Sequence, residues 1–241
     1  MLRKHLLLVC VLIWHLRLLA VQASDLVPAP APPMGWNSWD SYGTTVREAQ
    51  VKANADWMAA HLAKYGWQYI VVDIQWYEPN AQGHDYKPGA PLTMDDYGRL
   101  MPALNRFPSS ANGAGFKPLA DYIHGKGLEF GIHIMRGIPR QAVDDNLPIK
   151  DTPYHARDIA DKDNGCRWNS DMWGVDTTKP GAQAYYDSIA ALYASWGVDF
   201  IKADDMGSHL YRPDEIKALS VDTQNRARDG AQHFPRASAD L

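Results

Sequence analysis

The segment FIKADDM at residues 200–206 begins like a buried strand and then places Lys202, Asp204 and Asp205 in succession. Burying such charges without partners costs several kcal/mol each, so they must pair or face a wet cavity. Residues 202 and 204 lie on one side of a strand, because side chains alternate along it. We therefore expect the Lys202 ammonium to lower the pKa of Asp204, as a nucleophilic or cation-stabilising carboxylate requires. A plain salt bridge at a rim is the alternative.

Two further polar residues occupy equivalent positions. Asp73 closes the apolar run at residues 69–74, and His133 lies in the short apolar run at residues 130–134. Alone, a strand-end Asp more often caps a loop or the next helix, and a lone His more often has a structural role. Carboxylates at equivalent ends of two strands nevertheless favour one shared pocket.

Alternating elements position these residues. Gly residues close the helical patterns, and a strand follows each helix, which is typical of right-handed βαβ units in a parallel sheet. A (β/α) barrel carries its chemistry at the carboxyl ends of such strands. A doubly wound sheet is disfavoured because no Gly-rich phosphate loop follows the first strand. Helices are expected at residues 45–65, 116–126, 180–196 and 214–219, and strands at residues 69–74, 130–134 and 198–202.

The connection at residues 79–115 is rich in Pro, Gly, Asn and Asp and is too long for a simple turn, which indicates a functional loop. Nine Trp and twelve Tyr are a heavy aromatic load. They serve either as core and surface filler or as platforms for flat apolar faces such as sugar rings. The Trp residues with polar neighbours are Trp36, Trp39, Trp76, Trp168 and Trp173.

Composition narrows the classes of function. A net charge of −4 without a basic run argues against a nucleic-acid partner. Residues 1–23 have a basic start, an apolar run and a small-residue step, which is typical of a signal peptide. We therefore expect a secreted or periplasmic protein without a membrane anchor after cleavage, which leaves Cys166 without a disulfide partner.

Four segments in order resemble glycoside hydrolase family 27, the α-galactosidase or melibiase family. They are PPMGWNSWD at residues 32–40, YIVVDIQW at 69–76, FGIHI at 130–134 and WGVDFIKADD at 196–205. The resemblance implies a retaining exo-glycosidase on a (β/α)8 TIM-type barrel, followed in the family by an antiparallel β domain. It calls for no metal and no organic cofactor.

The resemblance also implies roles for individual residues. The nucleophile falls on Asp204, and Lys202 contacts sugar hydroxyls. Trp36 walls the sugar, and Asp73 binds the non-reducing hydroxyls. Trp76 and His133 are the further candidates for substrate binding. A retaining mechanism also needs a carboxylic acid about 5 to 5.5 Å from the nucleophile to protonate the leaving oxygen.

The sequence departs from the family at Ile74, where the family has a second Asp that accepts hydrogen bonds from outer galactose hydroxyls. An Ile cannot accept them, and an unpaired hydroxyl loses a few kcal/mol. The resemblance implies a terminal α-D-galactoside as substrate. Because of Ile74, we expect the pocket to tolerate or prefer a sugar without the exocyclic hydroxymethyl group, such as a β-L-arabinopyranoside. A second departure is Met206, where the family often has a Cys, so the family's disulfide is not expected.

The expected domains are a signal peptide at 1–23, a Pro-rich leader at 24–33, the N-terminal portion of a glycosidase barrel at 34–220 and an unrelated tail at 221–241. We count four strands by Lys202, of which three have the bounds given above, and a complete barrel needs eight. The family's acid/base Asp has no counterpart in this sequence. We therefore expect poor folding alone and negligible turnover from this chain.

Three alternatives remain open. A Schiff-base aldolase would use Lys202 as nucleophile, although a neighbouring Asp opposes the depressed lysine pKa that this requires. A metal-assisted barrel enzyme would use Asp73, His133, Asp204 and Asp205. An inactive carbohydrate-binding remnant would keep Trp36, Asp73 and Lys202. The sequence indicates no oligomeric state.

Overall fold

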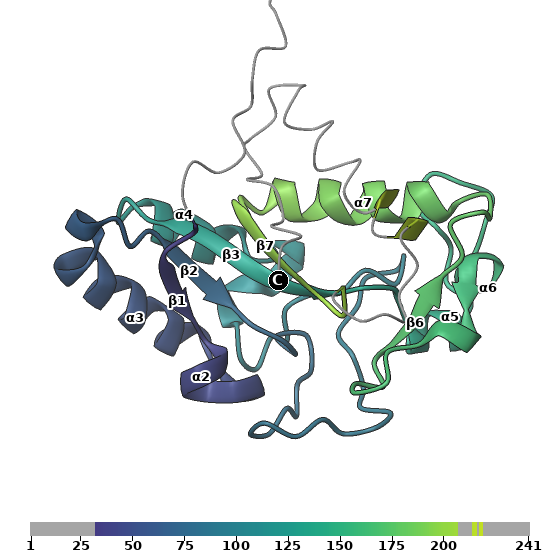
Figure 1. The fold of residues 1–241 in the computed structure, drawn as a ribbon, viewed down its shortest axis with the longest axis horizontal. Coiled ribbons are helices and arrows are strands. Elements are labelled where there is room, and N and C mark those ends of the chain that lie inside the picture. The colour runs from purple at the N-terminus through teal and green to yellow at the C-terminus, as the bar shows by residue number, and fades with distance from the viewer. Residues whose placement is uncertain (1–31, 207–213, 216, 219–241) are drawn as a thin grey trace, which may run out of the picture. The chain divides into compact units, whose positions relative to one another are not determined.

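Four parallel strands form the main sheet of the protein in the computed structural model (Figure 1), in the order β1, β2, β3 and β7. They are β1 (Gly35–Asn37), β2 (Tyr69–Val72), β3 (Glu129–Met135) and β7 (Phe200–Asp204). The structure describes residues 32–206, 214–215 and 217–218, all within one compact unit, Ala31–Leu241. The predicted parallel sheet and its α/β class are confirmed.

Three of the helices between the strands match predicted helices, and the short α2 (Trp39–Tyr42) was not predicted. The three are α3 (Glu48–His61), α4 (Lys117–His124) and α7 (Ala182–Ser195). The predicted helix at 45–65 is α3 followed by a 3₁₀ turn, Ala63–Tyr65, which ends at the left-handed Gly66. The start of α7 was placed too early, because its N-cap is Gly181 at φ 92° and no side chain caps it.

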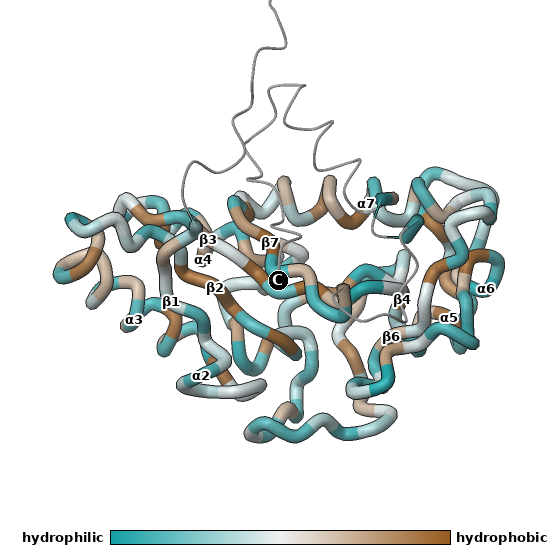
Figure 2. The backbone as a smooth tube through the Cα atoms, viewed as in Figure 1, coloured by the Kyte–Doolittle hydropathy of each residue, from teal (hydrophilic) through white to brown (hydrophobic). Residues whose placement is uncertain are grey.

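The main core lies between one face of the sheet and these helices. The residues of this face include Ile70, Ile132 and Ile201, and α3 contributes Val51 and Met58 at helical spacing. Figure 2 shows hydrophobic segments along β2, β3 and β7, while several connecting loops are hydrophilic. Because side chains alternate, residues one position away from these face the opposite side of the sheet.

An antiparallel excursion between β3 and α7 was not predicted. It contains β4 (Ile138–Pro139), α5 (Arg140–Asp144), α6 (Ala156–Ile159), β5 (Ala160–Asp161) and β6 (Met172–Val175), with strand order β4, β6, β5. A second core cluster packs it against α7, where Tyr185 and Tyr186 are almost fully buried. The excursion is therefore anchored to the barrel-type unit through α7.

The predicted long loop follows β2 and has one 3₁₀ segment, Pro108–Gly113. The buried Arg106 holds it by donating to the carbonyl oxygens of Thr44, Val46, Gln75 and Glu78. Burial lowers the pKa of Arg106 to about 10. A charged group with this many carbonyl acceptors fixes the loop where it leaves β2.

Several predictions lie outside the described residues: the signal peptide at 1–23, most of the leader at 24–33 and the tail at 221–241. Of the predicted helix at 214–219, the described residues Asp214, Glu215, Lys217 and Ala218 are helical. Among the residues that the structure describes, no helix is long and apolar enough to cross a membrane.

Candidate active site

The carboxyl ends of β2, β3 and β7 bring the predicted polar residues together. In the sheet register His133 lies opposite Lys202, and Asp204 lies opposite Met135. Asp73 follows the last residue of β2, Val72, whose register partner is Ile132. The side chains of Asp73, His133, Lys202 and Asp204 therefore share the sheet face that the helices do not cover.

The Asp204 carboxylate is hydrogen-bonded at both oxygens. Its Oδ2 lies 3.1 Å from His133 Nε2, and its Oδ1 accepts the Asp205 N–H at 2.7 Å. The hydrogen bond to His133 is the main cause that lowers the pKa of Asp204 to about 2. The side chain remains 38% exposed. Asp204 is therefore an ionised carboxylate that a substrate can approach.

The ion pair of Lys202 corrects the predicted pairing with Asp204. Lys202 Nζ lies 2.8 Å from Asp73 Oδ2, and Asp73 Oδ1 accepts the Ile74 N–H at 2.7 Å. Burial opposes the ionisation of Asp73, which is 1% exposed, but His133 and Lys202 outweigh it and lower the pKa of Asp73. Lys202 acts on Asp204 only as a minor charge, and His133 has the role predicted for Lys202.

Two predicted aromatic contacts are not at this face. Trp36 pairs in register with Ile70, and its partly buried side chain packs against the helix-covered core. Trp76 is fully buried in the same core and donates its indole N–H to the His133 carbonyl at 2.8 Å. The expected position of Trp36 is thus corrected, and Trp76 supports the strand that carries His133.

Trp39 and Tyr86, in contrast to Trp36, lie beside the polar face of the sheet. Both pack against the cluster that contains the buried Ile74, and their rings stack 6.1 Å apart at 14°. Burial, followed by the charges of Asp73 and Asp204, raises the pKa of Tyr86 to about 12. Tyr86 was missed because it lies in the long loop, where its only signal was an aromatic residue in a segment rich in Gly and Pro.

A buried acceptor joins the excursion to the loop after β2. Asp171 Oδ2 accepts from Gln75 Nε2 at 2.8 Å and from the Tyr77 hydroxyl at 3.0 Å. Gln75 itself has φ 62°, an uncommon conformation for a residue with a side chain.

Cys166 packs beside Ile74 without a disulfide, and burial raises the pKa of its thiol to about 11.

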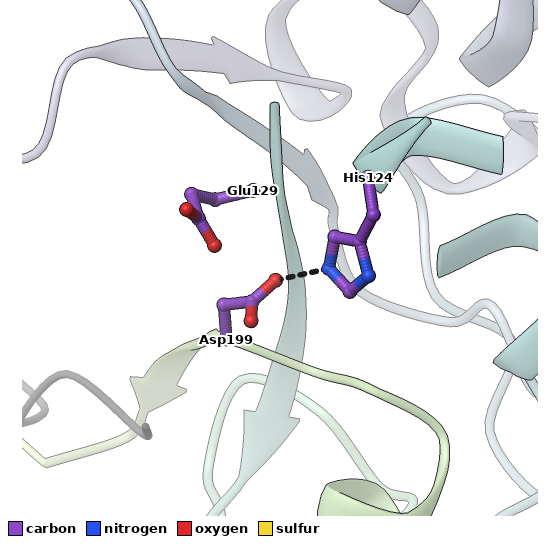
Figure 3. Close-up of side chains that lie close together, drawn as sticks. All are labelled: His124, Glu129 and Asp199. Atoms are coloured by element: carbon purple, nitrogen blue, oxygen red, sulfur yellow. Dashed lines mark hydrogen bonds and ion pairs between the residues drawn. The ribbon is translucent and has the colours of Figure 1, made fainter. Parts of the chain in front are cut away.

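A second polar cluster lies at the opposite ends of the strands. His124, Glu129 and Asp199 bring three possible metal-ligating atoms within 4.8 Å of one another, and Figure 3 shows them between the end of α4, the start of β3 and the segment before β7. The residues of the metal-assisted alternative, Asp73, His133, Asp204 and Asp205, do not form such a group among the described residues. Asp205 instead binds Arg136 at 2.8 Å.

Comparisons with known proteins agree on one family. No protein-family model matches the chain. The α-galactosidase of Coffea arabica is 31% identical over 185 residues, which are 76% of this chain and 35% of that protein. The α-galactosidase A of Cellvibrio japonicus is 30% identical over 93% of this chain and 43% of its own length.

A solved structure is more similar. A glycoside hydrolase family 27 β-L-arabinopyranosidase from Geobacillus stearothermophilus, in complex with arabinose, is 59% identical with a TM-score of 0.80, covering 86% of this chain and 47% of that one. The chain thus spans about half of this enzyme and about a third of the coffee enzyme. The strands fit part of a TIM-type barrel, and the chain belongs to glycoside hydrolase family 27.

Proposed function

We propose that this chain carries the nucleophile of a retaining exo-glycosidase, and that Asp204 is that nucleophile. The observation that carries the proposal is the Asp204 carboxylate, which has a pKa of about 2 and an open side chain beside the ion pair of the partly exposed Lys202 with the buried Asp73. A retaining glycosidase needs such an ionised carboxylate below the anomeric carbon. Lys202 and Asp73 are the groups suited to hold sugar hydroxyls.

The proposed step forms a bond between an Asp204 oxygen and the anomeric carbon while the bond to the leaving oxygen breaks. A carboxylic acid gives its proton to the leaving oxygen. Water then attacks the anomeric carbon of the ester, loses a proton to the same acid/base residue and releases the sugar with Asp204 regenerated. Two displacements on opposite faces retain the anomeric configuration.

The proposed substrate is a terminal β-L-arabinopyranoside, with an α-D-galactoside as the related alternative. Ile74 is buried in an apolar cluster with Met135, Met172 and Cys166, which offers an outer sugar hydroxymethyl group no acceptor from this side chain. The solved relative that is 59% identical is a β-L-arabinopyranosidase. Both considerations favour the smaller sugar.

The acid/base residue is not identified among the described carboxyl groups. Burial raises the pKa of Glu215, which would suit an acid, but Glu215 is 1% exposed. Its oxygens accept from Arg136, Tyr186 and the Val175 N–H. Glu215 is therefore too buried to protonate a leaving group, and we propose that it is not the acid/base residue.

The test uses a substrate whose leaving group needs no proton. The reagent is a β-L-arabinopyranosyl fluoride that carries another fluorine on the sugar ring. The anomeric fluorine leaves as fluoride, and the ring fluorine slows hydrolysis of the resulting glycosyl ester. We expect intact-mass spectrometry to show one added fluoro-sugar, and peptide mapping to place it on Asp204. Absence of labelling, or labelling elsewhere, would contradict the assignment of Asp204.

The galactosyl analogue of the same reagent tests the substrate. We expect slower labelling because its hydroxymethyl group must lie near Ile74. Faster labelling by the galactosyl reagent would contradict the preference for arabinopyranose without affecting Asp204. Binding of arabinose or galactose, measured by calorimetry, without labelling by either reagent would instead support the carbohydrate-binding remnant.

A further inference from the structure

The residue after the proposed nucleophile has an unusual backbone conformation. Asp205 has φ 60°, in the left-handed region that residues with a side chain seldom adopt. In this conformation its N–H donates to Asp204 Oδ1 at 2.7 Å. One oxygen of the nucleophile is therefore held by the backbone. Oδ2, whose contact with His133 is longer at 3.1 Å, is the better placed oxygen for attack.

Arg136 holds this backbone conformation. Its Nη2 donates to Asp205 Oδ2 at 2.8 Å, and its Nε donates to the Asp205 carbonyl oxygen at 3.3 Å. The backbone N–H of Arg136 donates to the Asp204 carbonyl oxygen at 3.2 Å. The guanidinium therefore binds Asp205 from both its side chain and its carbonyl, and a left-handed residue persists when its surroundings determine it in this way.

Arg136 is itself fixed from the other side. It is 4% exposed, and its Nη1 donates to Glu215 Oε2 at 2.8 Å. The other oxygen of Glu215 accepts the Tyr186 hydroxyl at 2.5 Å and the Val175 N–H at 3.0 Å. Burial alone would lower the pKa of Arg136, but Glu215 and Asp205 outweigh it and raise the pKa. A continuous set of polar contacts thus joins β6 and α7 to the nucleophile's neighbour.

The strand that carries Asp73 provides a contrast. Asp73 also accepts the N–H of the following residue, and Gln75 beyond it also has a positive φ. There the buried Arg106 donates to carbonyl oxygens alone. Arg136 is different because it bridges two carboxylates, so it couples the nucleophile's loop to a distant part of the fold.

We propose that Arg136 is a positioning residue: through Asp205 it fixes the orientation of the Asp204 carboxylate for attack on the anomeric carbon. The proposal rests on the assignment of Asp204 as nucleophile. Arg136 has no part in the covalent step itself. Its effect is geometric, because displacement of a reacting group by about 1 Å can cost about 100-fold in rate.

The test compares Arg136→Lys with Asp205→Asn in the full 241-residue chain. Lysine keeps the buried positive charge but cannot span Asp205 and Glu215 as a guanidinium does. Asparagine keeps the N–H that binds Asp204 and tolerates a positive φ, but it loses the ion pair with Arg136. The probe is the same fluoro-arabinopyranosyl fluoride, which reports the first-order rate constant of labelling, kinact, and the binding constant, KI, separately.

We expect each variant to lower kinact about tenfold or more at equal folded fraction, with KI within about threefold of wild type. The pH midpoint of labelling should move little, because the hydrogen bond from His133 is the largest cause of the lowered Asp204 pKa and the Asp205 N–H is a smaller one. The kinact of the double variant should lie within about threefold of the kinact of the slower single variant, because both changes break the same contact between Arg136 and Asp205.

Arg157→Lys is the matched control. Arg157 is an exposed arginine of the same excursion that donates to the carbonyl oxygens of Val143 and Asp144. Its kinact should equal that of wild type. An unchanged kinact in Arg136→Lys and Asp205→Asn, or a change confined to KI, would overturn the positioning role while leaving Asp204 as nucleophile. A wild-type chain that is not labelled would overturn both proposals.

Discussion

A His–Asp pair lies near each end of the neighbouring strands β3 and β7, and the amino-end pair joins the last residue of α4 to the residue before β7. At the carboxyl ends His133 Nε2 lies 3.1 Å from Asp204 Oδ2, and near the amino ends His124 Nε2 lies 2.6 Å from Asp199 Oδ2. The two pairs have the same residue types and similar separations. They differ in which partner is buried and in what else the carboxylate contacts.

At the carboxyl ends the histidine is fully buried, while the aspartate side chain is 38% exposed. At the amino ends the histidine is 36% exposed, and the same Asp199 oxygen also accepts the Phe130 N–H at 2.8 Å. The buried His133 thus holds a carboxylate open to a substrate. The exposed His124 instead contacts a carboxylate that already accepts a backbone N–H of β3. We call this purely structural contact a fastener. Residue type alone does not distinguish a substrate site from a fastener, but the burial of the two partners does.

The largest expected difference between the pairs comes from removing each carboxylate charge. Asp204→Asn should lower the rate of covalent labelling by the fluoro-arabinopyranosyl fluoride by about 1,000-fold or more, because loss of a nucleophile removes the covalent step. Asp199→Asn should leave the rate within about twofold, since substitutions away from the site change it little. Intact-mass kinetics at neutral pH measures both.

Equal losses in the two variants would contradict the comparison. Circular dichroism of each variant is the control, because an unfolded chain would also fail to label.

The free energy of unfolding of Asp204→Asn should differ from that of wild type in a way that depends on pH. The pKa of Asp204 falls from 3.8 to about 2 on folding, so its ionised form stabilises the fold above pH 3.8. That contribution is lost as the pH falls towards 2, and wild type and variant should then converge.

The second prediction concerns the ion pair that accompanies only the carboxyl-end site. Lys202→Met leaves Asp73 buried without its ammonium and should lower the free energy of unfolding by about 2–3 kcal/mol. A fully buried pair loses roughly 3–5 kcal/mol, and the value is smaller here because water reaches Lys202. Urea unfolding followed by tryptophan fluorescence measures it at pH 7.

Lys126→Met is the control, because Lys126 forms an exposed ion pair with Asp56 and should lose less than about 1 kcal/mol. The pH dependence has a defined sign. The pKa of Asp73 is lowered in the fold, so the stabilisation by Lys202 is present above pH 3.8 and lost as acid protonates Asp73. A Lys202→Met deficit that persists undiminished at pH 2–3 would rule out the ion pair as its cause.

The third prediction tests the role of the buried histidine. His133→Phe removes the hydrogen bond that is the main cause of the lowered Asp204 pKa, so that pKa should rise from about 2 towards 3.8. Labelling by wild type should be constant from pH 6 to pH 3. In the variant it should fall below about pH 4, as Asp204 becomes protonated.

His124→Phe is the matched change at the amino ends, and its labelling profile should follow wild type. An unchanged profile in His133→Phe would mean that another group keeps Asp204 ionised. Lys202 would then regain the role first predicted for it. The shape of the profile distinguishes these cases, whereas a lowered rate without a moved midpoint indicates disturbed packing.

The sequence predicted the parallel sheet because β-branched and apolar runs between Gly-terminated helices leave few alternatives. It also predicted which strand ends carry Asp73, His133, Lys202 and Asp204. It could not predict the partner of Lys202, because two carboxylates lay within reach and only the lateral order of β2, β3 and β7 decides between them.

Other errors have equally local causes. Trp36 was assigned to the site, but a three-residue strand gives no periodicity from which to tell its two faces. The excursion was missed because β4 and β5 have two residues each. Tyr86 was missed because loop contacts depend on tertiary structure that no local pattern encodes.

The smallest expected effect concerns the amino-end pair. His124→Gln keeps a donor of similar reach but loses any charge, and it should lower the free energy of unfolding by less than about 1 kcal/mol. Labelling should stay within about twofold of wild type. His124, Glu129 and Asp199 offer three possible metal-ligating atoms, so Zn²⁺ provides the counter-test. If Zn²⁺ raised the Tm of wild type by several degrees but not that of His124→Gln, the cluster would be a metal site rather than a fastener. An equal Tm with and without Zn²⁺ in both proteins, together with the small loss of stability, would support a structural role in which Asp199 accepts from His124 and the Phe130 N–H.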